Sequence, residues 1–137
     1  MGAATLAVVD TDVVSFLFKN HSIAAAYQAM LAARPLAISL TTLAEIEYGM
    51  EAKNWGAARR ELMRQFLARF TLLFPDAETA RIWARIKSGC ARRGRPIMFA
   101  DAWIAAAALQ LNVPLVTHNA SHHRVVENLT ILTAAVT

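Results

Sequence analysis

Short apolar runs rich in β-branched residues alternate with longer segments of helical periodicity along this 137-residue chain. Such alternation predicts parallel strands, because a strand that returns parallel to its neighbour needs a helical crossover to carry the chain back. We therefore expect an α/β sandwich with helices on both faces of one sheet. The expected strands cover residues 5–9, 36–40, 70–74, 113–117 and 129–133.

Local signals mark the ends of these elements. The four prolines lie at or beside an expected strand or helix end, where the missing N–H is tolerated. Thr41 or Thr42 can cap a helix after the second strand, and Asp76 can cap one after the third strand. The chain shows no internal repeat and no linker, so residues 1–137 are predicted to form a single domain.

Composition limits the class of protein. With 56% hydrophobic residues the chain can build its own core, which argues against disorder. The single cysteine, Cys90, can form neither an internal disulfide nor a cysteine-based zinc site, as expected in a reducing compartment. The chain begins without the basic segment of a signal peptide, and no stretch suits a membrane span. We expect a soluble, cytoplasmic protein with no membrane partner.

The charge balance favours a polyanionic partner. The net charge is +4 and the pI is about 9.8, and many basic residues fall within 59–69 and 81–95. Clustered Lys and Arg gain affinity for phosphates by counterion release, but two solvated helix faces with local ion pairs explain the pattern equally well. The candidate RNA contacts in the second stretch are Arg92, Arg93 and Arg95.

Acidic side chains follow the expected strands. The first strand ends at Asp10, and Thr11 and Asp12 follow at once. Glu45 lies early in the helix after the second strand. Asp101 precedes an apolar stripe, so its carboxylate is expected to point inward over the end of the sheet, to cap that helix, or to do both. Since the carboxyl ends of parallel strands meet at one edge, we expect Asp10, Glu45 and Asp101 to lie together.

Three carboxylates at one edge suggest a metal site. They repel one another unless a cation or raised pKa values compensate. Oxygen ligands without histidine or cysteine suit Mg²⁺ or Mn²⁺ rather than zinc. Such an ion can activate water and stabilise the charge of a phosphodiester transition state. Metal-dependent phosphodiester hydrolysis is therefore the leading hypothesis.

Four segments spaced over nearly the whole chain combine into a more specific signature. They read VVDTDVV from residue 8, ISLTTLAEIEYG from residue 38, GRPIMFADAWIA from residue 94 and LVTHN from residue 115. Together they resemble PIN-domain ribonucleases, most closely the toxins of VapBC-type bacterial toxin–antitoxin systems. The resemblance implies a single PIN-like three-layer α/β/α sandwich with a mostly parallel central sheet of four to five strands.

The resemblance also implies an activity and partners. Members of this family are Mg²⁺- or Mn²⁺-dependent endoribonucleases that cut tRNA, rRNA or mRNA and so halt growth. They typically form homodimers and are silenced by a cognate VapB-type antitoxin. Carried onto this sequence, the family's metal ligands match Asp10, Asp101 and Glu45, its fourth site position matches Asn119, and its supporting polar positions match Thr11 and Thr117.

Two features complicate this match. Asp12 could add a ligand or cap the following helix, and we favour the cap. His122 and His123 stand where relatives commonly have an acid followed by Phe, which leaves the fourth side of the site short of charge. Asn119 can donate a hydrogen bond or bind through its carbonyl, but it cannot act as a base. His118, His122 and His123 could bind Mn²⁺ or contact phosphate, although a solvated loop is our prediction.

Two other functions stay open. The missing fourth acid makes a catalytically weak RNA-binding module of the same fold plausible. A receiver-like signalling domain also places acids after its first strand, but here no Asp ends the third run and no Lys follows the last strands. Trp55, Trp83 and Trp103 could stack on bases, yet aromatics at helical spacing more often form core or dimer contacts.

Overall fold

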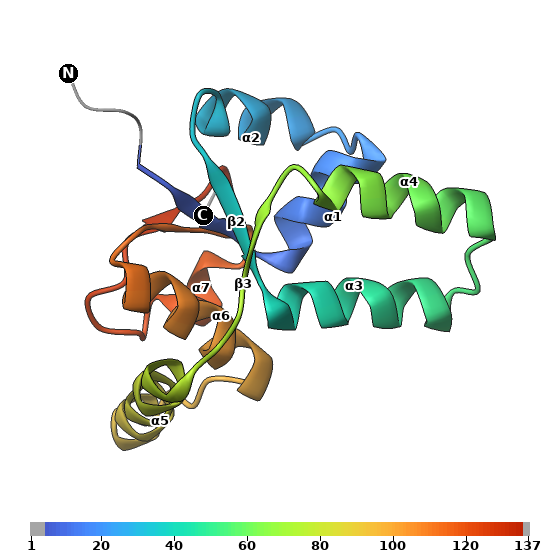
Figure 1. The fold of residues 1–137 in the computed structure, drawn as a ribbon. Helices are drawn as coiled ribbons and strands as arrows, with labels where there is room; N and C mark the ends of the chain where they lie inside the picture. Colours follow the sequence, from blue (N-terminus) through green and yellow to red (C-terminus); the bar gives the residue numbers. More distant parts are fainter. Residues whose placement is uncertain (1–4, 136–137) are drawn as a thin grey trace.

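The computed structural model describes residues 5–135, which form a parallel five-stranded sheet with strand order β3-β2-β1-β4-β5. This confirms the parallel α/β architecture (Figure 1). Each strand is shorter than its apolar run, because the runs extend into the flanking turns. The strands are β1 (Ala7–Val9), β2 (Leu36–Ser39), β3 (Thr71–Leu73), β4 (Leu115–Val116) and β5 (Ile131–Leu132).

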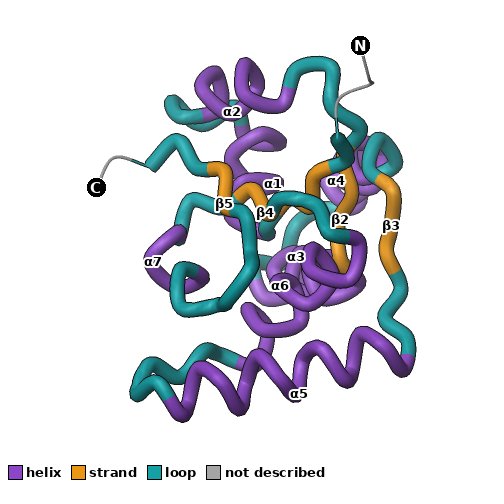
Figure 2. Tube along the Cα trace, turned by 90° about the vertical axis from the view of Figure 1, so that its left-hand side faces the viewer, coloured by secondary structure: helices purple, strands orange, loops and turns teal. Residues whose placement is uncertain are grey.

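Helices cover both faces of this sheet and complete the three layers (Figures 1 and 2). The first four helices pack on one face, and α6 lies between the other face and α5. No helix within residues 5–135 combines the length and apolar character needed to cross a bilayer. The helices are α1 (Thr11–Lys19), α2 (Ala24–Leu31), α3 (Leu40–Ala52), α4 (Ala57–Leu67), α5 (Ala77–Arg92), α6 (Phe99–Leu111) and α7 (Ala120–His123).

The central strand β1 contributes side chains to the hydrophobic cores on both faces of the sheet, because alternate side chains of a strand point in opposite directions. Val9 joins the larger core beneath α1 to α4. Val8 points the other way and packs with Ile104 and Ala108 of α6. The run of alanines in α6 is almost entirely buried, so this helix lies close against the strands. That close packing brings the start of α6 to the carboxyl end of the sheet.

Two strand–helix junctions at this end are very short. Asp10 is the only residue between β1 and α1, and α3 begins directly after β2. The predicted cap at Thr41 or Thr42 is wrong, because the Ser39 hydroxyl accepts the backbone N–H of Thr42 and starts the helix earlier. Glu45 consequently lies in the second turn of α3. The cap predicted at Asp76 for α5 is confirmed.

Candidate functional site

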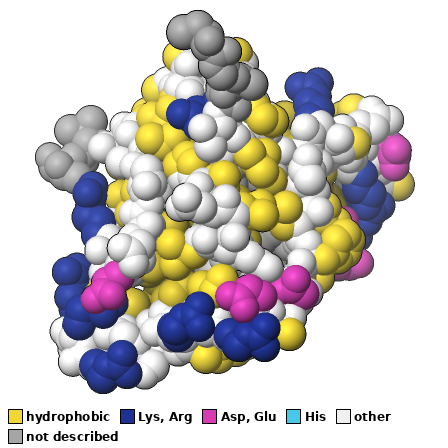
Figure 3. Space-filling view, turned by 60° about the vertical axis from the view of Figure 1, so that its left-hand side comes forward, with side chains coloured by type: hydrophobic (Ala, Val, Ile, Leu, Met, Phe, Trp, Pro, Cys, Tyr) yellow, Lys and Arg dark blue, Asp and Glu magenta, His cyan; other side chains and the backbone are white. Residues whose placement is uncertain are grey.

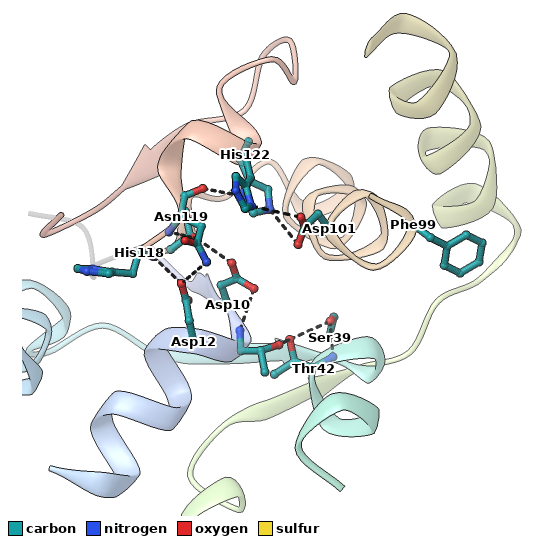
Figure 4. Close-up of polar contacts among 12 residues, drawn as sticks. Asp10, Asp12, Ser39, Thr42, Phe99, Asp101, His118, Asn119 and His122 are labelled. Atoms are coloured by element: carbon teal, nitrogen blue, oxygen red, sulfur yellow. Dashed lines mark hydrogen bonds and ion pairs between the residues drawn. The ribbon is translucent and has the colours of Figure 1, made fainter. Parts of the chain in front are cut away.

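Asp10 lies at the centre of the carboxyl edge of the sheet, between β1 and α1 (Figure 4). Its side chain is 5% exposed, and both carboxylate oxygens have partners. The backbone N–H of Thr11 donates to Oδ1 at 2.8 Å, and the hydroxyl of Thr117 donates to Oδ2 at 2.7 Å. Thr117 follows β4, so two neighbouring strands fix the position of one carboxylate. The lone pairs that remain on Asp10 can still accept a cation or a proton.

Asp12 belongs to the same edge and is not a helix cap. The N-cap of α1 is Asp10, so the interpretation of Asp12 as the cap is wrong. Asp12 Oδ1 accepts the N–H of Val13, while Oδ2 accepts the N–H of His118 and the side-chain amide of Asn119 at 3.0 Å. Burial, together with the negative charge of Asp10, raises the pKa of Asp12 to about 6. Asp12 therefore anchors the loop after β4 and adds a carboxylate beside Asp10.

Asp101 reaches this edge from α6. It is the third residue of the helix, whose N-cap is Met98, so Asp101 itself does not cap the helix. The pKa of Asp101 is raised, chiefly by burial and further by the charge of Asp10, while the charge of His123 acts in the opposite direction. As predicted, the carboxylate points over the end of the sheet (Figure 4). We call Asp10, Asp12 and Asp101 the acid rim.

Glu45 lies at the margin of the acid rim. Its side chain is exposed, and its Oε1 accepts the hydroxyl of Thr11 at 2.6 Å. The same hydroxyl lies 3.0 Å from Oγ1 of Thr42, which is fully buried. Sequence reasoning found Thr11 as a supporting residue but considered Thr42 only as a helix cap, and missed its contact with Thr11. The structure thus links Glu45 to the rim through a hydroxyl rather than by direct contact.

The donor set bears on whether a metal ion fits. Within residues 5–135, no three His, Cys, Asp or Glu side chains converge closely enough to enclose an ion. Mg²⁺ usually keeps several waters and uses only one or two carboxylates, so full enclosure by protein is not required. Burial first, and the charge of Asp10 in addition, raise the pKa values of Asp12 and Asp101, while the charges of His122 and His123 act against the shift at Asp101. The rim therefore carries acids with no Lys or Arg partner among the described residues. An oxygen-binding cation would supply compensating positive charge.

Two histidines flank Asp101. His122 Nδ1 lies 3.8 Å from Asp101 Oδ2, and His123 Nε2 lies 4.0 Å from Oδ1. His123 is fully buried, and its Nδ1 lies 3.3 Å from the carbonyl oxygen of Asn119, to which it can donate. Its Nε2 has no hydrogen-bond partner among the described residues. The predicted solvated loop is therefore wrong for His123, because α7 folds this segment against α6.

His118 is also held in place rather than solvated. Its Nδ1 lies 2.6 Å from the hydroxyl of Tyr27, and its ring packs edge-on against Phe16. Tyr27 is fully buried in α2, and its hydroxyl also accepts the N–H of Ala134. Sequence reasoning missed Tyr27, since nothing near residue 27 indicates a contact with residue 118. Only His122 is exposed, as the loop prediction required.

The three arginines proposed to contact RNA have different surroundings. Arg93 donates to Glu127 at 3.0 Å and to the carbonyl of Val125, and Arg92 donates to Ser88. Arg95 instead lines a cavity of about 300 Å³ that also contains Asp101 and His122. Figure 3 shows basic and acidic groups side by side along the edge formed by α5, which fits local ion pairing there. Among the three arginines, Arg95 alone lies beside the acid rim.

Sequence and structure comparisons give a consistent result. The PIN domain family model matches residues 7–128. Ribonuclease VapC1 of Haemophilus influenzae (strain R2866) is 30% identical over 127 residues, covering 89% of this chain and 92% of that protein. The tRNA(fMet)-specific endonuclease VapC of Shigella flexneri is 30% identical over 112 residues, covering 82% of this chain and 85% of that protein.

Solved structures show the same fold. The structure of VapBC-1 from nontypeable Haemophilus influenzae contains a chain with a TM-score of 0.77 and 26% identity, covering 93% of this chain and 97% of that chain. The structure of VapBC2 from Rickettsia felis, bound to a DNA fragment from the promoter, gives a TM-score of 0.83 at 22% identity. That match covers 93% of this chain and 98% of the other, and at this identity it supports the fold alone.

Proposed function

This chain belongs to the PIN-domain family, and from its acid rim we propose that it is an endoribonuclease acting as the toxin of a type II toxin–antitoxin system. The curated relatives named ribonucleases match it over most of their length. The observation that carries the proposal is the rim itself, where Asp10 from the β1–α1 junction, Asp12 from α1 and Asp101 from α6 lie at one edge of the sheet. Such a site is suited to phosphodiester chemistry that depends on a divalent ion.

We propose that Asp10 and Asp101 hold Mg²⁺, with Mn²⁺ as an alternative, and that Glu45 contributes from the margin. A bound ion would lower the pKa of a water molecule and stabilise negative charge on the phosphodiester group. Thr11 and Thr117 orient Asp10 in advance, so little reorganisation is needed on binding. Glu45 is held toward the rim by the hydroxyl of Thr11.

Asn119 has a positioning role in this proposal. Its side-chain amide donates to Asp12, and its backbone carbonyl faces His123. An amide cannot remove a proton from water, so catalysis depends on the aspartates and Glu45. Since Asn119 stands at the position where relatives often have an acid, a catalytically weak RNA-binding module of the same fold is the second candidate function.

The proposed substrate is RNA, and the proposed partners are a VapB-type antitoxin and a second copy of this chain. These partners rest on the relatives, since related structures are described as VapBC complexes. Expression of this chain alone should arrest growth. Expression together with the neighbouring open reading frame should relieve the arrest.

Cleavage by the purified chain tests the proposed activity. Transfer RNA, ribosomal RNA and messenger RNA should be incubated with Mg²⁺, with Mn²⁺ or with EDTA, and the products resolved on denaturing gels. We expect cleavage that requires the ion and that disappears in Asp10→Asn and in Asp101→Asn, with unchanged circular dichroism. RNA binding without cleavage under either ion would favour the RNA-binding module instead.

A further inference from the structure

Three positive side chains gather at the ends of α1 and α3 that are farthest from the acid rim. Lys19 is the last residue of α1, Lys53 caps the C-terminus of α3, and Arg59 lies in the first turn of α4. We call these residues the basic cluster. Because α1 starts after Asp10 and α3 after Ser39, both helices run from the carboxyl edge of the sheet toward this cluster (Figure 1).

A groove between α1 and α3 connects the two places. It has a volume of about 110 Å³, and its lining includes Thr11 and Glu45 at the rim and Lys19, Lys53 and Trp55 at the far end. Lys19 is eight positions after Thr11, and Lys53 is eight positions after Glu45. At a helical rise of about 1.5 Å per residue, the lysines lie roughly 12 Å from the rim. An extended ligand bound at the rim can therefore reach the basic cluster along the groove.

The positive charges of the basic cluster are not neutralised by the protein. Lys19 and Lys53 line the same groove as Trp55, and the guanidinium of Arg59 lies over the Trp55 ring, so the three cations lie near one another. The pKa of Lys19 is lowered by partial burial and then by the charges of Lys53 and Arg59. Within residues 5–135, none of the three forms an ion pair with an acid. Neighbouring arginines of α4 do form such pairs, namely Arg60 with Glu51 and Arg64 with Glu47.

Arg59 is held in a fixed position. Its guanidinium carbon lies 3.8 Å from the ring centroid of Trp55. Trp55 in turn stacks on Phe18, with a centroid distance of 5.9 Å and an interplanar angle of 23°. The Trp55 ring attracts the guanidinium, and like charges on Lys19 and Lys53 repel it. An anionic ligand would relieve that repulsion.

We propose that Lys19, Lys53 and Arg59 form a phosphate-binding subsite for single-stranded RNA, which receives backbone phosphates a few nucleotides from the bond cut at the acid rim. The proposal rests on the proposed ribonuclease function. Negative charge at the rim repels RNA, so cations further along the strand are needed to hold it. The subsite is separate from the arginines of residues 92–95, of which Arg92 donates to Ser88 and Arg93 to Glu127.

Helix dipoles give a simpler reason for a lysine at a helix C-terminus. Helix dipoles explain the positions of Lys19 and Lys53 one by one. They do not explain why Lys19, Lys53 and Arg59 lie near one another, where the like charges lower the pKa of Lys19. They also do not explain a groove that leads to the acid rim. An acidic segment of a protein partner would also suit three cations, but continuity with the proposed cleavage site favours RNA.

Binding of a 5′-labelled single-stranded oligouridylate, followed by fluorescence anisotropy in EDTA, tests the subsite without cleavage. The test variant is Lys19→Gln/Lys53→Gln. The matched control is Arg81→Gln/Arg85→Gln, which removes the same charge from exposed positions on α5. We expect the test variant to bind about tenfold more weakly. The slope of log affinity against log salt should fall by about 1.4, since each phosphate contact on a single strand contributes about 0.7.

The control should change affinity less than twofold. Equal losses in both variants, or an unchanged salt slope, would overturn the proposal in favour of a general charge effect. RNA binding that stays intact while binding of the cognate antitoxin weakens would overturn it in favour of a protein partner. In cleavage assays, the test variant should raise KM and keep kcat. Absence of cleavage by the wild-type protein would count against the ribonuclease proposal alone, because the anisotropy measurement does not depend on cleavage.

Discussion

The acidic side chains on α3 of the α3–α4 hairpin and those of the acid rim differ in what faces them. In the hairpin, an arginine of α4 faces each of two acids on α3, at 2.9 Å for Arg64 with Glu47 and 3.0 Å for Arg60 with Glu51. At the rim, acids face one another, and the pKa values of Asp12 and Asp101 are raised. These two acids of the hairpin are each paired with an arginine, whereas among the described residues no Lys or Arg pairs with an aspartate of the rim. Substitutions in the two regions should therefore separate stability from activity.

The largest expected effect is on cleavage by Asp101→Asn. If the rim holds the ion that stabilises the transition state by several kcal/mol, the single-turnover rate should fall by about 100-fold or more. The thermal midpoint should stay the same or rise, because one repelling charge is removed. Rapid-quench kinetics and calorimetry measure the two quantities. Full activity in this variant would show that Asp101 is not needed for cleavage.

Binding of the ion is expected to have a smaller effect, on the free energy of unfolding. Mg²⁺ or Mn²⁺ at about 100 times its Kd should stabilise the folded protein by about 2.7 kcal/mol. Asp10→Asn should abolish this shift, while Glu47→Gln in the hairpin should keep it. Thermal unfolding with and without EDTA gives the answer. An equal shift in Asp10→Asn would mean that the ion binds elsewhere.

The dependence of stability on pH is expected to be smaller still. The folded pKa of Asp12, about 6, exceeds the ordinary value of 3.8, so the folded protein binds a proton that the unfolded chain has released. This contribution is complete below the unfolded pKa and is lost as the pH rises through about 6. Without metal, Asp12→Asn should therefore be more stable than the wild type at about pH 7.5, by about 1 kcal/mol after allowance for solvent screening.

Urea unfolding at about pH 5 and about pH 7.5 in EDTA measures this difference. The gain from Asp12→Asn should be smaller at the lower pH, where the wild-type carboxyl is largely protonated. A gain that is independent of pH would show that burial and the charge of Asp10 do not raise the pKa of Asp12 in the folded protein.

The smallest effect is expected in the hairpin. Glu47→Gln breaks an exposed pair with Arg64, and exposed pairs often contribute nothing measurable. The unfolding midpoint and the cleavage rate should both match the wild type. A clear loss of cleavage would contradict this expectation and give the Glu47–Arg64 pair a role in the reaction.

Much of the fold and part of the site could be predicted because they depend on local patterns. The alternation of apolar runs and helical segments predicted the parallel sheet. The rule that parallel strands end at one edge predicted that Asp10 and Asp101 lie close together. The family resemblance predicted from four motifs is confirmed by the PIN domain match.

Other features depend on contacts between distant segments. Asp12 binds the loop at Asn119, and His123 is buried because α7 packs near Asp101. Neither contact leaves a signal in the residues around Asp12 or His123. Glu45 lies in the second helical turn because Ser39, rather than a threonine, begins α3. Long-range packing and one cap therefore account for the predictions that were wrong.

The one-residue junction at Asp10 limits how the site can change over evolution. An extra residue there would rotate α1 by about 100°, since a helix turns once in 3.6 residues. The buried pair Val13 and Val14 and the carboxylate of Asp12 could then not keep their present directions together. Insertions and deletions are excluded at this point, so the chemistry of the rim can vary only by substitution. Differences in length between relatives should instead collect at longer connections, such as residues 93–98 between α5 and α6.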